Sequence, residues 1–154
     1  MSNKERSRRP PERCDLLFGT ADPPLGVVTD LERVVTRLRE KFPDVLIRLR
    51  ADSGFARPAL YEACERLRVE YSIGLGMNQV LKRQSEELLE LAVKQQESTG
   101  EPQRLFTAFD YQASTWSSLR WVVVKCEANA KGTNRRAVVT NRPGARTLPQ
   151  GAYE

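Results

Sequence analysis

The 154-residue sequence predicts a fold that is α/β at its centre. Apolar residues recur at helical spacing between Thr29 and Lys41, and side chains then alternate between two faces from Val45 to Arg50. A second helix and a second strand repeat this order as far as Leu75. Because strands that alternate with helices usually pair in parallel, we expect a mainly parallel sheet layer covered by helices.

The first predicted helix covers residues 29–41 and has one apolar face. That face is formed by Leu31, Val34, Val35 and Leu38, with Phe42 one turn further on. Thr29 followed by Glu32 matches a capping box, in which the two side chains satisfy free backbone amides at the start of a helix. Pro43 marks the end of the helix.

Two further helices and a strand follow. Pro58 suits the first turn of a short helix that carries Leu60, Ala63, Cys64 and Leu67. Residues 69–75 alternate and predict a strand. A longer helix is expected from Asn78 to Glu97 with one apolar face, and the segment 98–102 ends it.

The remainder of the chain predicts β structure. Residues 105–111, 121–127 and 136–140 read as strands, and residues 128–135 as a polar loop between the last two. Residues 1–13 hold no large apolar side chain after Met1, which predicts a disordered basic tail. We therefore expect four parts: the tail at 1–13, a core at 14–100, a β-rich part at 101–141, and a turn-rich tail at 142–154.

Composition limits the chemistry. The sequence has no histidine, which excludes Ser-His-Asp and Cys-His catalysis and leaves carboxylates as the main candidates. Cys14, Cys64 and Cys126 form no C-x-x-C pair, so we expect reduced thiols that are mostly buried. The formal net charge of +5 favours a polyanion such as nucleic acid, although many basic proteins bind nothing specific. Without a membrane span or signal peptide, a soluble intracellular protein is expected.

Asp52 is the main candidate for chemistry. It follows an apolar strand, at the end of the strand where open parallel sheets bind their ligands. From the pattern alone two interpretations stay open. Asp52 can be a turn-former whose side chain accepts a hydrogen bond from a nearby backbone amide, which is the commoner case, or it can be a ligand-binding carboxylate.

Two weaker signals favour structural explanations. Gly74 and Gly76 follow a strand, but position 79 is Gln where a dinucleotide-binding loop needs its third glycine, so that function is rejected. Several aromatic residues lie among arginines and allow either a base-stacking surface or core packing, which is commoner in strands. These residues are Phe106, Phe109, Tyr111, Trp116 and Trp121, with Arg104 and Arg120.

Several motifs in this order resemble a known family. They are RADSGF at residues 50–55, YSIGL at 71–75, RLFTAF at 104–109, WVVVKCE at 121–127 and VVTN at 138–141. Over about residues 14–150 the chain resembles insertion-sequence DDE transposases, transposase DDE domain group 1, of the insertion-sequence 1380 type. The resemblance implies an RNase H-like core, interrupted by a β-rich insertion, that cuts and joins DNA. In that family two Asp and one Glu hold two divalent metals, usually Mg²⁺.

The resemblance makes Asp52 the family's second aspartate, and therefore a catalytic and metal-binding position. Asp15, Asp22 and Asp30 do not sit in the motif of the first aspartate, and Glu154 is not on the family's glutamate helix. We therefore expect a partial RNase H-like core (helix-strand-helix-strand), truncated at both ends, that binds Mg²⁺ poorly and is inactive alone.

Two alternatives to a transposase fragment stay open. The basic chain could bind DNA nonspecifically, or pair with intact transposase in an oligomer and inhibit it. It could also be a relic without function. The resemblance further implies a cytoplasmic, nucleoid-associated protein in a bacterium.

Overall fold

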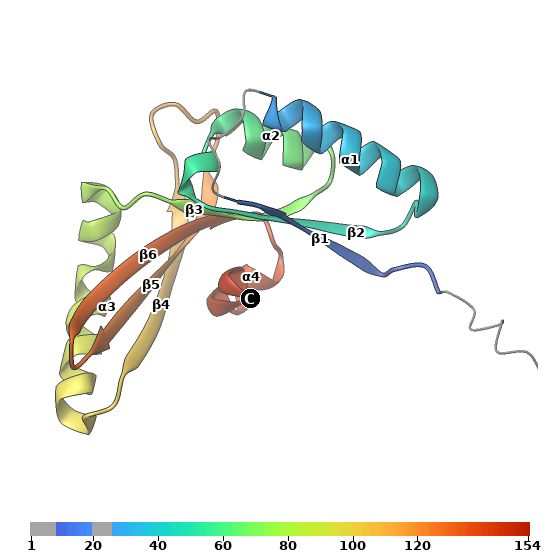
Figure 1. The fold of residues 1–154 in the computed structure, drawn as a ribbon. Helices are drawn as coiled ribbons and strands as arrows, with labels where there is room; N and C mark the ends of the chain where they lie inside the picture. The colour runs from blue at the N-terminus through green and yellow to red at the C-terminus, as the bar shows by residue number, and fades with distance from the viewer. Residues whose placement is uncertain (1–8, 20–25) are drawn as a thin grey trace, which may run out of the picture.

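The computed structural model describes residues 9–19 and 26–154, which form one six-stranded sheet with helices (Figure 1). The strands are β1 (Arg13–Phe18), β2 (Leu46–Ala51), β3 (Glu70–Leu75), β4 (Gln103–Tyr111), β5 (Arg120–Asn129) and β6 (Gly132–Thr140). The helices are α1 (Val27–Lys41), α2 (Pro58–Arg66), α3 (Gln79–Thr99) and α4 (Gly144–Thr147), with 3₁₀ turns η1 (Ser53–Phe55) and η2 (Pro149–Tyr153). The mixed α/β class is as predicted.

The sheet as a whole is mostly antiparallel, so the prediction of a mainly parallel layer is wrong except for β1–β3. Its strand order is β1-β2-β3-β6-β5-β4. Only β1–β2 and β2–β3 pair in parallel, whereas the β3–β6, β6–β5 and β5–β4 pairs are antiparallel. The reason is that α3 leads to the far edge strand β4, from which the chain returns through β5 and β6 without further helices. Parallel pairing is confined to the part with helical crossovers.

The polar segment predicted as a loop at 128–135 is instead a tight hairpin. β5 and β6 extend until Asn129 pairs with Gly132, which leaves only two residues between the strands. The Asn129 side chain accepts a hydrogen bond from the Lys131 amide at 2.8 Å, and Gly132 has a φ of 139°, which suits glycine. Polar residues form strand here because these ends of β5 and β6 are largely exposed.

Two element starts differ from the sequence prediction. The capping box at Thr29 is wrong: α1 begins at Val27, and its N-cap is Gly26, with a φ of 106° and no side-chain cap. β1 was not predicted as a strand, and it begins at Arg13, inside the predicted tail. The starts of α2 at Pro58 and of α3 after Asn78 are as predicted, and the Asn78 side chain accepts a hydrogen bond from the Leu81 amide at 2.9 Å. The predicted tail at 1–8 and Asp22 lie outside the described residues.

Helices cover one face of the sheet. α1 and α2 lie over β1–β3 in Figure 1, and the apolar residues Ile47, Leu49, Tyr71 and Ile73 point into the core between them. α3 packs against β4 and β5. Cys64 and Cys126 are buried free thiols, as predicted, and burial raises the pKa of Cys64 to about 12. Within residues 9–19 and 26–154, none of the helices has both the length and the apolar character needed to cross a membrane.

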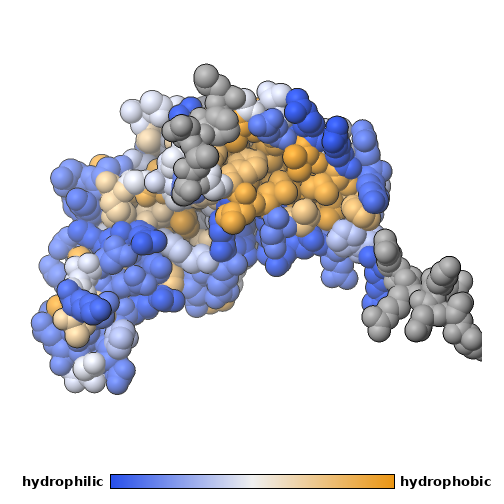
Figure 2. All heavy atoms as spheres, in the orientation of Figure 1, coloured by the Kyte–Doolittle hydropathy of each residue, from blue (hydrophilic) through white to orange (hydrophobic). Residues whose placement is uncertain are grey.

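The opposite face of the sheet is covered only in part. The segment 142–154, with α4 and η2, packs on β4–β6 and buries Ala145 and Ala152 there. β3 pairs with β6, so the predicted core and the predicted β-rich part share one sheet. β1 forms the sheet edge next to an apolar area (Figure 2), and its Leu17 is 76% exposed. The boundaries between the four parts stay predictions.

Candidate functional site

Asp52 begins a tight turn at the end of β2. Its carboxylate Oδ1 accepts a hydrogen bond from the Gly54 amide at 2.9 Å, and its carbonyl accepts one from Phe55 at 3.1 Å. The Phe55 side chain is 4% exposed and anchors the turn in the core. The turn-forming interpretation of Asp52 is thus confirmed. It does not exclude the ligand-binding one, because the carboxylate Oδ2 makes no hydrogen bond to a described residue.

Gly74 of β3 lets this turn lie against the sheet. A Cβ atom on Gly74 would be 3.0 Å from the Ser53 nitrogen and 3.3 Å from the Asp52 carbonyl carbon. Both are backbone atoms, which cannot turn aside as a flexible side chain can. The sequence predicted that this glycine lets the chain turn out of the strand. The structure places it inside β3, where it fixes the position of Asp52.

Asp52 lies in a basic groove with a volume of about 470 Å³. The cationic residues that line the groove are Arg50, Lys125, Arg135 and Arg136. Among the described lining residues Asp52 is the only carboxylate. The electrostatic field in the groove therefore favours an anion.

Two of these four cations have partners and two do not. Arg135 donates to the Lys82 carbonyl at 2.9 Å and forms an ion pair with Glu86 of α3. Lys125 lies 3.4 Å from the Glu127 carboxylate. Arg50 and Arg136 are exposed and form no ion pair with a described residue. These two guanidinium groups are therefore available to a ligand.

The C-terminal segment forms one wall of the groove. The Tyr153 hydroxyl is placed to donate to either of two carbonyls, that of Arg136 at 2.7 Å and that of Val123 at 3.1 Å. The ammonium group of Lys125 lies 4.9 Å from the centre of the Tyr153 ring. Residues 142–154, predicted as a turn-rich tail, are folded onto the sheet in short helical turns.

The side chains in the groove do not fit a two-metal centre. In residues 9–19 and 26–154, no group of three or more His, Cys, Asp or Glu side chains could hold a metal ion. Asp15 pairs with Arg13 at 3.0 Å, Asp30 lies 3.7 Å from Arg33, and neither lines the groove, nor does Glu154. A pair of divalent ions needs several converging oxygen ligands, of which Asp52 is one.

Of the five aromatic residues with two possible roles, Trp116 is buried in the core, and the other four are half-buried against the two apolar clusters. This placement favours core packing over a base-stacking surface. Trp116 is 7% and Arg120 is 5% exposed. The Arg120 guanidinium donates two hydrogen bonds to Glu65, at 2.9 and 3.0 Å, and stacks over the Tyr61 and Trp116 rings. Glu65 was not predicted from the sequence, because no local pattern connects residues 55 positions apart.

Fold and groove together define a basic α/β domain with an aspartate at the end of a parallel strand. The chain belongs to the family described as Transposase DDE domain group 1, whose model matches residues 7–154. The comparison with curated proteins and the comparison with solved structures each found no match. Membership indicates a transposase-related function and implies DNA as the substrate. The family typically uses a divalent metal, for which the described residues offer no complete ligand group.

Proposed function

We propose that this chain provides part of the DNA-cleaving centre of an insertion-sequence DDE transposase of the 1380 type, with Asp52 as its catalytic metal ligand. The observation that supports this is the RADSGF turn, which presents Asp52 at the end of a parallel strand in a basic groove. In this proposal residues 14–100 are part of an RNase H-like core, and residues 101–141 are its β-rich insertion.

Asp52 is the one carboxylate among the described residues that line the groove, and this limits the metal binding and cleavage that the chain can achieve alone. The first aspartate and the glutamate of the family have no counterpart near Asp52 among the described residues. The full ligand set then requires carboxylates from outside the described residues. We propose that the isolated chain binds Mg²⁺ weakly and cleaves no DNA, because one carboxylate leaves most of the coordination sphere to water.

Paramagnetic broadening by Mn²⁺ tests the role of Asp52. We expect millimolar Mn²⁺ to broaden the amide resonances of Ser53 and Gly54 in the wild type, and much less in Asp52→Asn. Asp15→Asn is the matched control, because it removes a carboxylate outside the groove. Equal broadening in wild type and Asp52→Asn would show that Asp52 does not bind the metal. Nicking of supercoiled DNA that Asp52→Ala abolishes would disprove the proposed inactivity.

The basic groove favours a second candidate function, nonspecific DNA binding without catalysis. Arg50 and Arg136 are exposed and have no ion pair among the described residues, so each is free to contact a phosphate. We expect fluorescence anisotropy to show DNA affinity that falls steeply with salt, because each phosphate contact releases counterions.

Substitution of these two arginines tests the contacts. The double change Arg50→Gln and Arg136→Gln should lower the slope of log affinity against log salt by about 2, about 1 for each lost contact. Arg37→Gln removes one arginine charge at an exposed position of α1, outside the groove, and should leave the slope unchanged. An unchanged slope in the double variant, or no DNA binding at low salt, would contradict this function.

In another form of this second function, the chain inhibits intact transposase. In it the chain pairs with intact transposase on DNA in the bacterial cytoplasm, in association with the nucleoid. Its support is the same basic groove, which would occupy DNA without a complete set of carboxylates. Addition of the chain should then lower the rate at which the intact enzyme cleaves DNA. The double variant with Arg50→Gln and Arg136→Gln should lower this rate less than the wild-type chain does.

A further inference from the structure

α1 and α2 lie over one face of β1–β3, as Figure 1 shows. On the other face, residues of β1, β2 and β3 line a second basic pocket. The pocket has a volume of about 260 Å³. Its charged lining residues are Arg13, Asp15, Arg48, Arg50, Arg142 and Glu154. Arg50 also lines the groove of Asp52, so the two hollows adjoin on the same face of the sheet.

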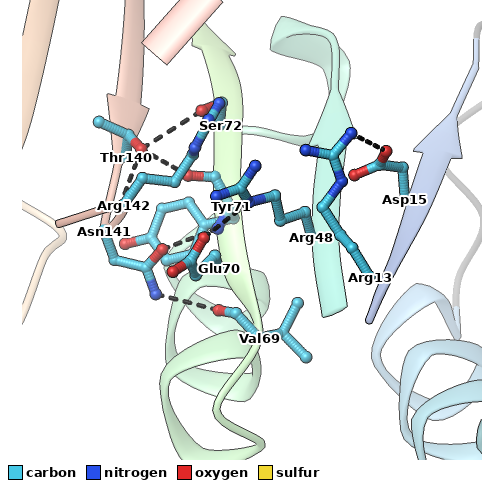
Figure 3. Close-up of polar contacts among 10 residues, drawn as sticks. All are labelled: Arg13, Asp15, Arg48, Val69, Glu70, Tyr71, Ser72, Thr140, Asn141 and Arg142. Atoms are coloured by element: carbon cyan, nitrogen blue, oxygen red, sulfur yellow. Dashed lines mark hydrogen bonds and ion pairs between the residues drawn. The ribbon is translucent and has the colours of Figure 1, made fainter. Parts of the chain in front are cut away.

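The VVTN motif fixes Arg142 at this pocket. The Asn141 side chain continues the hydrogen bonding between β3 and β6 past the end of β6 (Figure 3). Its Oδ1 accepts a hydrogen bond from the Tyr71 amide at 2.7 Å, and its Nδ2 donates one to the Val69 carbonyl at 3.0 Å. The Thr140 hydroxyl donates to the Tyr71 carbonyl at 2.7 Å and accepts from the Arg142 amide at 3.1 Å. The backbone that carries Arg142 is therefore held by four hydrogen bonds.

Two of the four arginines around the pocket are neutralised. Arg13 pairs with Asp15 at 3.0 Å, and Arg48 pairs with Glu70 at 2.8 Å (Figure 3). Arg50 and Arg142 form no ion pair with a described residue. Burial, and then the nearby Arg48, lower the pKa of Arg142, while Glu70 acts in the opposite sense. The pocket thus concentrates positive charge that the described carboxylates leave partly unbalanced.

We propose that Arg50 and Arg142 bind a phosphate group in this pocket, which adjoins the groove of Asp52 and does not include Asp52 itself. Planar guanidinium groups suit phosphate because they donate parallel hydrogen bonds to two of its oxygens. The phosphate can belong to a nucleic-acid strand or be a free anion. Only its assignment to a DNA strand rests on the proposed function.

Glu154 is the competing carboxylate in the pocket. It lines the same hollow, although it forms no ion pair with Arg50 or Arg142. Its negative charge opposes the entry of an anion. The proposal therefore requires opposite effects from two substitutions: Arg142→Gln weakens phosphate binding, and Glu154→Gln strengthens it.

NMR of the arginine Nε–Hε groups tests the site in the full chain, without divalent metal. We expect inorganic phosphate, and in a second titration a short thymidine oligonucleotide, to shift the signals of Arg50 and Arg142. Arg142→Gln should lower the affinity about tenfold or more, the effect of one lost charge-assisted hydrogen bond. Arg37→Gln on α1 is the control of equal charge. Phosphate should also raise the melting temperature of the wild type more than that of Arg142→Gln.

The two titrations separate the sources of the phosphate group. Tighter, salt-sensitive binding of the oligonucleotide identifies a nucleic-acid strand, whereas binding of inorganic phosphate alone identifies a free anion, and both support the site. The proposal is overturned if neither ligand shifts the Arg142 signal, or if Arg37→Gln weakens binding as much as Arg142→Gln does. The NMR titration needs no metal and no cleavage. A negative result in the Mn²⁺ test of Asp52 therefore leaves the phosphate-site proposal unaffected.

Discussion

Glu65→Ala is expected to lower the free energy of unfolding by about 1.5–3 kcal/mol, the range for losing hydrogen bonds to a charged group. The loss stays below that of a fully buried ion pair because the Glu65 side chain is itself 37% exposed. The Arg120 side chain is 4% exposed and has Glu65 as its counter-ion, so the substitution leaves its charge buried and unpaired. The Tyr71 hydroxyl also loses the carboxylate to which it donates at 2.8 Å. Equilibrium urea denaturation measures the loss.

Two further variants show whether the loss comes from the buried charge. Glu62→Ala makes the same change on the exposed face of α2, where Glu62 accepts one hydrogen bond from Ser117 at 3.0 Å, and should cost about 0.5 kcal/mol. Combining Glu65→Leu with Arg120→Met removes both charges and should restore part of the stability. Equal losses in Glu62→Ala and Glu65→Ala would mean that the ion pair is not the cause.

The elements that the sequence predicted well are those whose signals are local. α3 follows Asn78, a good N-cap, and β2 and β3 alternate apolar and polar side chains within a few residues. β1 was missed because Leu17 faces solvent beside Leu16 and hides the alternation. β1 forms a strand by pairing with β2, which comes after α1 in the sequence. A local sequence pattern does not indicate a partner at that distance.

The connections between strands were less predictable for the same reason. The segment 128–135 has a loop-like composition, yet its two ends pair with each other as the continuation of β5 and β6. The apolar parts of these two strands lie in the core and set their alignment. The sheet is mostly antiparallel because β6, rather than β4, lies next to β3. Val122, Val124 and Val139 of β5 and β6 are buried in the main core, a placement that only the assembled sheet shows.

The candidate site was predicted only around Asp52. The turn at Asp52 follows from the DSG sequence, so its hydrogen bond to Gly54 was foreseeable. The basic groove was not, because Arg50 and Arg136 come from strands separated by most of the chain. The VVTN motif carries part of the family resemblance, but its physical role in holding β3 emerges only when β3 and β6 lie side by side.

Gly74→Ala is expected to destabilise the chain by about 1–3 kcal/mol and to displace the Asp52 turn. The added methyl group would lie 3.0 Å from the Ser53 nitrogen and 3.3 Å from the Asp52 carbonyl carbon, so the backbone has to move. Replacing glycine by alanine in a strand normally gains about 0.5–1 kcal/mol, which is too little to offset the steric conflict. Denaturation gives the stability, and the Ser53 and Gly54 amide shifts report the displacement.

Gly76→Ala is the matched control for this substitution. Gly76 lies two residues further on and is exposed, and a methyl group added there would have no atom within 4 Å. Its replacement should therefore leave the stability within about 0.5 kcal/mol of the wild type. If Gly74→Ala were as stable as Gly76→Ala and left the Ser53 and Gly54 shifts unchanged, the close approach of β3 would not be what positions Asp52. The groove would then depend on the turn alone, through the bond from Gly54 to the Asp52 carboxylate.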